Sequence, residues 1–153
     1  VYWLLEQACM TVPALGEAAA YVPYMALVIP VFSGLRLAKF NIDERQTTSF
    51  IGMPVPAHAL FWASIGYAFD SAVPVDSLGF VVGTIVAAIL FSFLLVSEVP
   101  MFSLKVKSLV WKGNELRYIL IAGAVVFVAL FGVLGIAGTI ILYIILSFFN
   151  KKR

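Results

Sequence analysis

The chain has 153 residues, of which 63% are hydrophobic and 12% are charged, and its mean hydropathy is +1.06. An ordinary soluble domain is about half apolar and about a quarter charged, so this composition excludes that class and predicts an integral membrane protein. The net charge of +2 is too small to indicate nucleic-acid binding. Cys9 is the single cysteine, which excludes a disulfide framework or a cysteine metal site within this sequence.

The apolar segments are long and lack period-two alternation, so we expect helices rather than the strands of a barrel. Val1 stands in the middle of an apolar segment with no basic stretch ahead of it, which does not resemble a signal peptide. We therefore expect residues 1–10 to be the end of a helix that begins upstream, and the chain to be the carboxy-terminal part of a longer protein. Pro13 and Gly16 predict a short polar turn over 11–17.

Three further spans follow in order. The first is expected at 18–40, with Pro23 and Pro30 inside it, because prolines are tolerated in membrane helices. A shorter, aromatic-rich helix is expected at 57–69. Residues 78–96 form a span of the about 20 residues that a bilayer requires.

Residues 117–149 are apolar throughout, and as one helix they would extend on the order of 45–50 Å, too long for a hydrocarbon core of about 30 Å. Glycines at 132, 135 and 138 lie in the middle, where we expect a turn between helices at 118–131 and 136–149. These glycines could also let helices approach closely, but the turn is the simpler explanation of all three. One long tilted helix is the alternative. The chain is thus predicted to be a single all-α transmembrane domain over 1–153, a polytopic bundle of about five complete spans plus the end of a preceding one.

The cations are segregated in this arrangement. All ten Lys and Arg side chains lie in 36–56, in 98–117 or in the C-terminal tail, which fall on one side of the predicted bundle. The turns at 11–17, 70–77 and 132–135 fall on the other side and contain no cation. The positive-inside rule places the basic side, and the C-terminus, in the cytoplasm.

Three polar residues at the end of the 18–40 span are candidate ligand-binding residues. Arg36 and Lys39 are three apart and therefore share a helix face, and Asn41 follows as the chain leaves the helix. The simplest interpretation is snorkelling of the cations to phospholipid headgroups. The alternative is a phosphate site at the membrane surface, since the forked guanidinium of Arg36 suits phosphate.

Two other polar residues receive structural interpretations. His58 is the only histidine and has no carboxylate beside it in the sequence, so we expect a structural or interfacial role. Glu98 is interpreted as a loop carboxylate near Lys105 and Lys107. The sequence contains no Ser-His-Asp set, no glycine-rich phosphate loop and no histidine pair at metal spacing.

Three stretches carry a family resemblance. R-L-A-K-F-N at 36–41 resembles the R-L-A-R-F-N signature of bacterial CDP-diacylglycerol–serine O-phosphatidyltransferases, the phosphatidylserine synthases of the CDP-alcohol phosphatidyltransferase family. F-I-G-M-P-V-P-A at 50–57 is similar to the family's F-x-G-L-P-x-P-A, and L-L-V-S-E-V-P-M-F-S-L-K at 94–105 is similar to its L-M-V-S-x-I-x-Y-x-S-F-K. Lys39 stands where the family has a second Arg, and Glu98 stands where a cation is common.

The resemblance implies a multi-pass enzyme of the bacterial inner (cytoplasmic) membrane that transfers the phosphatidyl group from CDP-diacylglycerol to L-serine and releases CMP. It also implies membrane lipid and a second copy of the chain, as a homodimer, among the partners. Arg36, Lys39 and Asn41 would then line a polar cavity and bind phosphate or the serine carboxylate.

In the family, the carboxylates of D-x-x-D-G-x-x-A-R and G-x-x-x-D-x-x-x-D hold divalent metal (Mg or Mn) and supply the base for the acceptor hydroxyl. Asp43, Asp70 and Asp76 do not fit this motif, which precedes R-L-A-R-F-N in the family. We therefore expect the catalytic residues and metal ligands upstream of Val1, and this chain alone to be inactive.

Two alternatives stay open. Another member of the same family would use a different acceptor, such as glycerol phosphate. A transporter or non-catalytic membrane subunit would carry polar groups near mid-bilayer or interrupted helices. In this sequence the charges lie at predicted helix ends, and Pro23 and Pro30 are the obvious interruptions.

Overall fold

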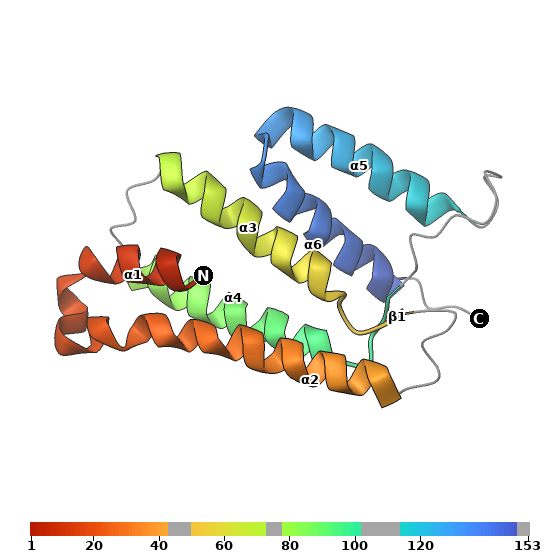
Figure 1. Ribbon diagram of the computed structural model, residues 1–153. Coiled ribbons are helices and arrows are strands. Elements are labelled where there is room, and N and C mark those ends of the chain that lie inside the picture. Colours follow the sequence, from red (N-terminus) through yellow and green to blue (C-terminus); the bar gives the residue numbers. More distant parts are fainter. Residues whose placement is uncertain (43–49, 73–77, 102–113, 150–153) are drawn as a thin grey trace.

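The computed structural model describes residues 1–42, 50–72, 78–101 and 114–149, and this part of the chain is all-α apart from two very short strands, as the sequence predicts (Figure 1). The elements in chain order are α1 (Tyr2–Met10), the 3₁₀ helices η1 (Pro13–Ala20) and η2 (Val22–Leu27), α2 (Val28–Ile42), β1 (Phe50–Ile51), α3 (Val55–Ala72), α4 (Leu78–Val96), β2 (Pro100–Met101), α5 (Glu115–Phe131) and α6 (Leu134–Phe149).

Within the described residues, two helices are long and apolar enough to cross a membrane, namely Val22–Ile42 and Leu78–Val96, and α6 is a shorter apolar helix. The span predicted at 78–96 is confirmed at both ends. The helix predicted at 57–69 is longer than expected, because α3 begins at Val55 with Pro56 in its first turn, a position that tolerates a missing N–H, and continues to Ala72.

The span predicted at 18–40 was wrong at its start. Residues 13–20 wind as a 3₁₀ helix interrupted at Gly16, which adopts φ +49°, and the continuous helical stretch begins at Val22. Its first six residues are 3₁₀ and it becomes α-helical at Val28. Pro23 fits this start, since the amide hydrogen that proline lacks would have no intrahelical acceptor in a first turn.

The helical hairpin predicted for the C-terminal apolar run is confirmed, and the single long helix is excluded. Gly132 ends α5 with φ +57°, a conformation that favours glycine, and α6 starts two residues later. The expectation that the turn explains all three glycines was wrong. A Cβ on Gly135 would overlap the Phe127 backbone, so Gly135 allows α5 and α6 to approach closely, whereas a Cβ on Gly138 would make only ordinary contact with the Phe127 ring at 3.4 Å.

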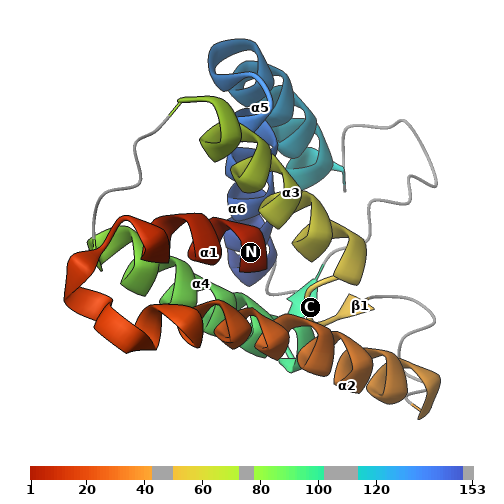
Figure 2. The same cartoon turned by 60° about the vertical axis from the view of Figure 1, so that its left-hand side comes forward.

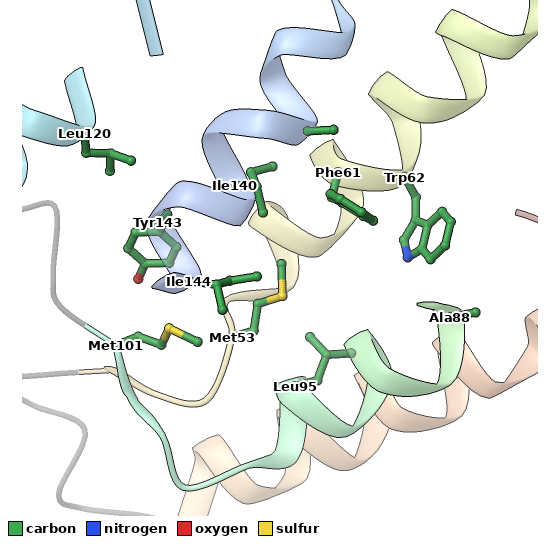
Figure 3. Packing of buried hydrophobic residues seen from close by; sticks show 11 residues of the cluster. Met53, Phe61, Trp62, Ala88, Leu95, Met101, Leu120, Ile140, Tyr143 and Ile144 are labelled. Atoms are coloured by element: carbon green, nitrogen blue, oxygen red, sulfur yellow. The ribbon is translucent and has the colours of Figure 1, made fainter. Parts of the chain in front are cut away.

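Two apolar clusters hold the helices together. The larger one joins α3, α4 and α6, and its buried members include Met53, Phe61, Leu95 and Ile144 (Figure 3). Phe61 of α3 stacks on Phe91 of α4 with ring centroids 4.1 Å apart. The smaller cluster packs one side of α1, including Leu5, Ala8 and Cys9, against η2 and α4 (Figure 2). Because α2 packs on α4 and α3 packs on α6, the chain forms one connected bundle.

Candidate functional site

Four segments that are distant in sequence meet at one end of the bundle. Figure 1 shows that α2, α4 and α6 end on the side where α3 and α5 begin. We call this region, formed by residues 36–42, 50–58, 94–101 and 114–117, the polar end. It contains all three described cations, Arg36, Lys39 and Arg117. The segregation of cations predicted from the sequence therefore holds within the described part of the chain.

The segments at 50–53 and 94–101 are joined through their backbones. β1 and β2 pair antiparallel, with Phe50 opposite Met101 and Ile51 opposite Pro100. Beyond the strands, the amide of Gly52 donates to the Val99 carbonyl at 2.9 Å, and the amide of Met53 donates to the Leu94 carbonyl at 2.9 Å. This pairing was not predicted from the sequence, because two-residue strands lack a detectable period.

Gly52 makes this close approach possible. It adopts φ +77°, and a Cβ at this position would lie 2.6 Å from the Leu95 carbonyl oxygen and 2.8 Å from the Ser97 carbonyl oxygen. A residue with a side chain would therefore meet both backbone strain and a steric clash. Gly52, the glycine of F-I-G-M-P-V-P-A, thus has a structural role: it allows residues 50–53 to pack closely against the end of α4.

Arg36 connects the end of α2 to the same region. Its side chain is only 5% exposed, its Nε donates to the Met53 carbonyl at 3.4 Å, and its guanidinium carbon lies 5.8 Å from the Phe40 ring centroid. The snorkelling interpretation was therefore wrong for Arg36, whose charge lies inside the polar end rather than on the surface of the bundle. Arginine stays protonated under all ordinary conditions, so the site contains a buried positive charge.

Lys39 lies on the same face of α2, as its spacing from Arg36 predicts. Its Nζ donates to the carbonyl of Val96, the last residue of α4, at 3.1 Å, and lies 3.5 Å from the Glu98 carboxylate. A helix end leaves its last carbonyls without intrahelical donors, so Lys39 caps α4. Glu98 was expected near Lys105 and Lys107, which lie outside the described residues; the contact that the structure records is with Lys39.

Asn41 is not brought together with the two cations. It is exposed, and it follows Arg36 by five positions and Lys39 by two, which places it on a different face of α2. Its side chain forms no hydrogen bond within residues 1–42, 50–72, 78–101 and 114–149. If Asn41 binds a ligand, that ligand lies at the rim of the polar end.

His58, in the first turn of α3, is 2% exposed, and its Nε2 accepts a hydrogen bond of 3.3 Å from Trp62 Nε1. The two rings, together with Phe91, form an aromatic contact between α3 and α4. The expectation of a structural role for this lone histidine agrees with its burial and its bond to Trp62.

No group of three or more His, Cys, Asp or Glu side chains that could hold a metal ion occurs among the described residues. Glu98 faces Lys39, and Asp70 lies near the opposite end of α3, whereas Asp43 and Asp76 are outside the described residues. A divalent metal site therefore does not fit this part of the chain. No protein-family model, curated protein or solved structure matches the sequence.

Proposed function

We propose that this chain is the carboxy-terminal transmembrane portion of a CDP-diacylglycerol–serine O-phosphatidyltransferase of the bacterial cytoplasmic membrane. The complete protein would make phosphatidylserine and CMP from CDP-diacylglycerol and L-serine. In this proposal the described helices belong to a polytopic bundle of about five complete spans, with the polar end in the cytoplasm.

The observation that carries the proposal is the contact between the three family-like stretches. Arg36 of R-L-A-K-F-N bonds to Met53 of F-I-G-M-P-V-P-A, and Met53 bonds through its amide to Leu94 of the third stretch. Lys39 completes the set by bonding to Val96. Stretches that resemble one family at three separate positions and also pack on one another are expected of a common site rather than of chance similarity.

In the proposed reaction, the serine hydroxyl oxygen forms a bond to the phosphorus that carries the diacylglycerol, and the phosphoanhydride bond to CMP breaks. The hydroxyl proton passes to a carboxylate base. The proposal places that base, and the ligands for the divalent metal (Mg or Mn) that the family uses, in a segment ahead of Val1, because the described residues provide no cluster for them.

Arg36 is the residue of this chain with the clearest proposed role. In this proposal a phosphate or a serine carboxylate enters from the cytoplasm and approaches the buried, permanent charge of Arg36, and burial strengthens the attraction of that charge for an anion. Lys39 and Asn41 are proposed to assist at the edge of the same site. Lys39 forms an ion pair with Glu98, and Asn41 lies at the rim of the polar end.

The test is serine-dependent release of CMP from CDP-diacylglycerol by protein expressed from its complete reading frame. We expect Arg36→Ala to lower the rate at least about tenfold, the size of effect expected when one charged contact to a phosphate is lost. Arg117→Ala is the matched control. Arg117 is also a cation of the polar end, but it bonds to Asn114 of its own helix start, and we expect its replacement to leave the rate unchanged.

The result also separates the alternatives. Release of CMP with glycerol phosphate and not with serine would assign the protein to another acceptor in the same family. A complete protein that releases CMP with neither acceptor would contradict the enzyme and favour a transporter or a non-catalytic subunit. Release of CMP by residues 1–153 alone would contradict the placement of the catalytic carboxylates ahead of Val1.

A further inference from the structure

The helical span Val22–Ile42 changes its winding partway along. Its first part, Val22–Leu27, is the 3₁₀ helix η2, and the rest is α2, which is α-helical from Val28 onward. Runs of 3₁₀ helix longer than about three or four residues are uncommon, because their hydrogen-bond geometry is poorer than that of an α-helix. A 3₁₀ run of 6 residues that continues directly into an α-helix therefore needs a cause.

Pro30 provides this cause. In an α-helix that began at Val22, the Ala26 carbonyl would accept from the amide of residue 30, but proline has no amide hydrogen and its ring would clash with that carbonyl. Proline is accommodated in a first turn, and Pro30 lies in the first turn of α2. The Ala26 carbonyl instead accepts from the Val28 amide, which also donates to Met25 three positions earlier. Pro30 thus restricts α-helical winding to the residues from Val28 onward.

The two windings differ in rotation and in length. A 3₁₀ helix turns by about 120° and rises by about 2.0 Å per residue, whereas an α-helix turns by about 100° and rises by about 1.5 Å. Over the 6 residues of η2, these differences amount to about 120° and about 3 Å. The rotation of α2 about its own axis therefore depends on the winding of η2.

The burial of side chains along the span agrees with the 3₁₀ winding. Pro23 and Ala26 are the buried residues of η2, and Arg36 is the buried residue of α2. With 3₁₀ winding in η2 and α winding in α2, Pro23 and Ala26 both lie about 40° from Arg36 around the axis. With α winding throughout, Pro23 would lie about 140° from Arg36, on the opposite side of the span. The 3₁₀ winding therefore brings the buried faces of η2 and α2 onto one side.

We propose that Pro30 is a positioning residue for Arg36: by holding η2 in the 3₁₀ winding, it sets the rotation of α2 that directs Arg36 into the polar end. Pro30 is exposed and lies about 9 Å along the axis from Arg36, so it acts through the helix. If η2 rewound as an α-helix while it stayed packed on α1, Arg36 would turn by about 120°, away from the Met53 carbonyl. The role of Pro30 in this rotation is independent of the function proposed above, whereas its effect on the reaction rests on that function.

Cross-linking between α2 and α4 measures the rotation. The ring centroids of Phe32 in α2 and Phe93 in α4 lie 5.1 Å apart, so cysteines at these two positions are within reach of a short bifunctional thiol reagent. The protein is expressed from its complete reading frame, with Cys9 and any other native cysteine replaced by serine, and the cross-link is detected by mass spectrometry. We expect Pro30→Ala to abolish the cross-link, because position 32 turns away from position 93.

A one-residue insertion distinguishes a change of rotation from a general loss of packing. One alanine inserted between Leu27 and Val28 adds about 100°, which offsets all but about 20° of the rotation lost in Pro30→Ala. The insertion alone should also abolish the cross-link, whereas the insertion combined with Pro30→Ala should restore it. Two changes that merely disturbed packing would not restore the cross-link together.

Pro13→Ala is the matched control. Pro13 is an exposed proline in the first turn of η1, where either winding accommodates it, and we expect the cross-link to form in full.

Serine-dependent release of CMP tests the consequence for the proposed reaction. We expect Pro30→Ala to lower the rate about tenfold, as Arg36→Ala is expected to do, and the insertion to recover it. In a variant that carries both Arg36→Ala and Pro30→Ala, the rate should be no lower than in Arg36→Ala, because changes that act through one contact are not additive.

An undiminished cross-link in Pro30→Ala, or a cross-link that the insertion does not restore, would overturn the positioning role of Pro30. Rate losses that multiply when Arg36→Ala and Pro30→Ala are combined would overturn its action through Arg36. If Pro30→Ala does not fold, recovery of folded, cross-linked protein by the added insertion supports the role, and failure to recover it contradicts the role. A complete protein that releases no CMP would contradict the proposed function, and the cross-link would then decide the role of Pro30 by itself.

Discussion

The Lys39 ammonium lies 3.5 Å from the Glu98 carboxylate, although 59 positions separate the two residues in the chain. Lys39 stands where the family that the chain resembles has an arginine, and Glu98 stands where that family commonly has a cation. Two cations at this distance would repel each other, whereas lysine and glutamate attract. The charges of Lys39 and Glu98 therefore compensate for each other. A basic residue at 98 would be compatible with the fold only if the side chain at 39 adopted a rotamer that points away from it.

Replacing Lys39 should cost more stability than replacing Glu98. Glu98 is 71% exposed and contributes to a surface ion pair, so Glu98→Gln should lower the free energy of unfolding by less than about 1 kcal/mol. Lys39→Met also removes the donor to the Val96 carbonyl, and we expect a further loss of about 1 kcal/mol. Thermal unfolding in detergent at low and high salt checks this order. Equal effects of the two variants would contradict the capping role of Lys39.

Gly52→Ala should destabilise the polar end. The new Cβ would lie 2.6 Å from the Leu95 carbonyl oxygen, and alanine at φ +77° is strained, so we expect a cost of about 2 kcal/mol or more. Gly83→Ala is the matched control, because Gly83 is a helical glycine of α4 with no atom within 4 Å of its Cβ position. Unfolding curves of both variants in detergent provide the comparison. A Gly52→Ala variant as stable as Gly83→Ala would contradict the close approach described here.

Gly135→Leu should separate α5 from α6. The Gly135 Cβ position overlaps the Phe127 backbone, which cannot move away as a flexible side chain could. Gly66→Leu tests the same substitution in α3 at a position with open space around it. A disulfide between cysteines placed on facing positions of α5 and α6 reports the separation, and we expect it to form in the Gly66→Leu background and not in the Gly135→Leu background. Equal yields would show that the hairpin tolerates the larger residue.

The proposed topology predicts which residues face the cytoplasm. Glu17 lies in η1 and Glu98 closely follows the end of α4, and these two segments lie at opposite ends of the bundle (Figure 1). Both glutamates are exposed. In a Cys9→Ser background, Glu98→Cys should react with a membrane-impermeant maleimide only after the cytoplasmic side is opened, and Glu17→Cys should react in intact cells with a permeable outer membrane. The reverse pattern would place the polar end outside and contradict the positive-inside orientation.

The sequence alone determined the all-α class, the helix at 78–96 and the C-terminal hairpin, whose helix boundaries it predicted within three residues. These features depend on local properties: the length of an apolar run and the position of a glycine where a run is too long for one helix. The same local properties gave a wrong start for the 18–40 span, because proline and glycine favour tight turns as well as kinked helices. In addition, hydrophobic periodicity does not distinguish a 3₁₀ helix from an α-helix over so few residues.

The contacts of the polar side chains were determined only by the tertiary structure. The sequence places Arg36 at a helix end, which suits snorkelling equally well, and only the packing of residues 50–53 against α4 brings the Met53 carbonyl within 3.4 Å of its Nε. Likewise, the sequence shows a lone histidine and a serine 25 positions apart, whereas the fold brings His58 and Ser33 to one cavity. Contacts between such distant residues depend on how whole helices pack, and that arrangement leaves no periodic signal in the sequence.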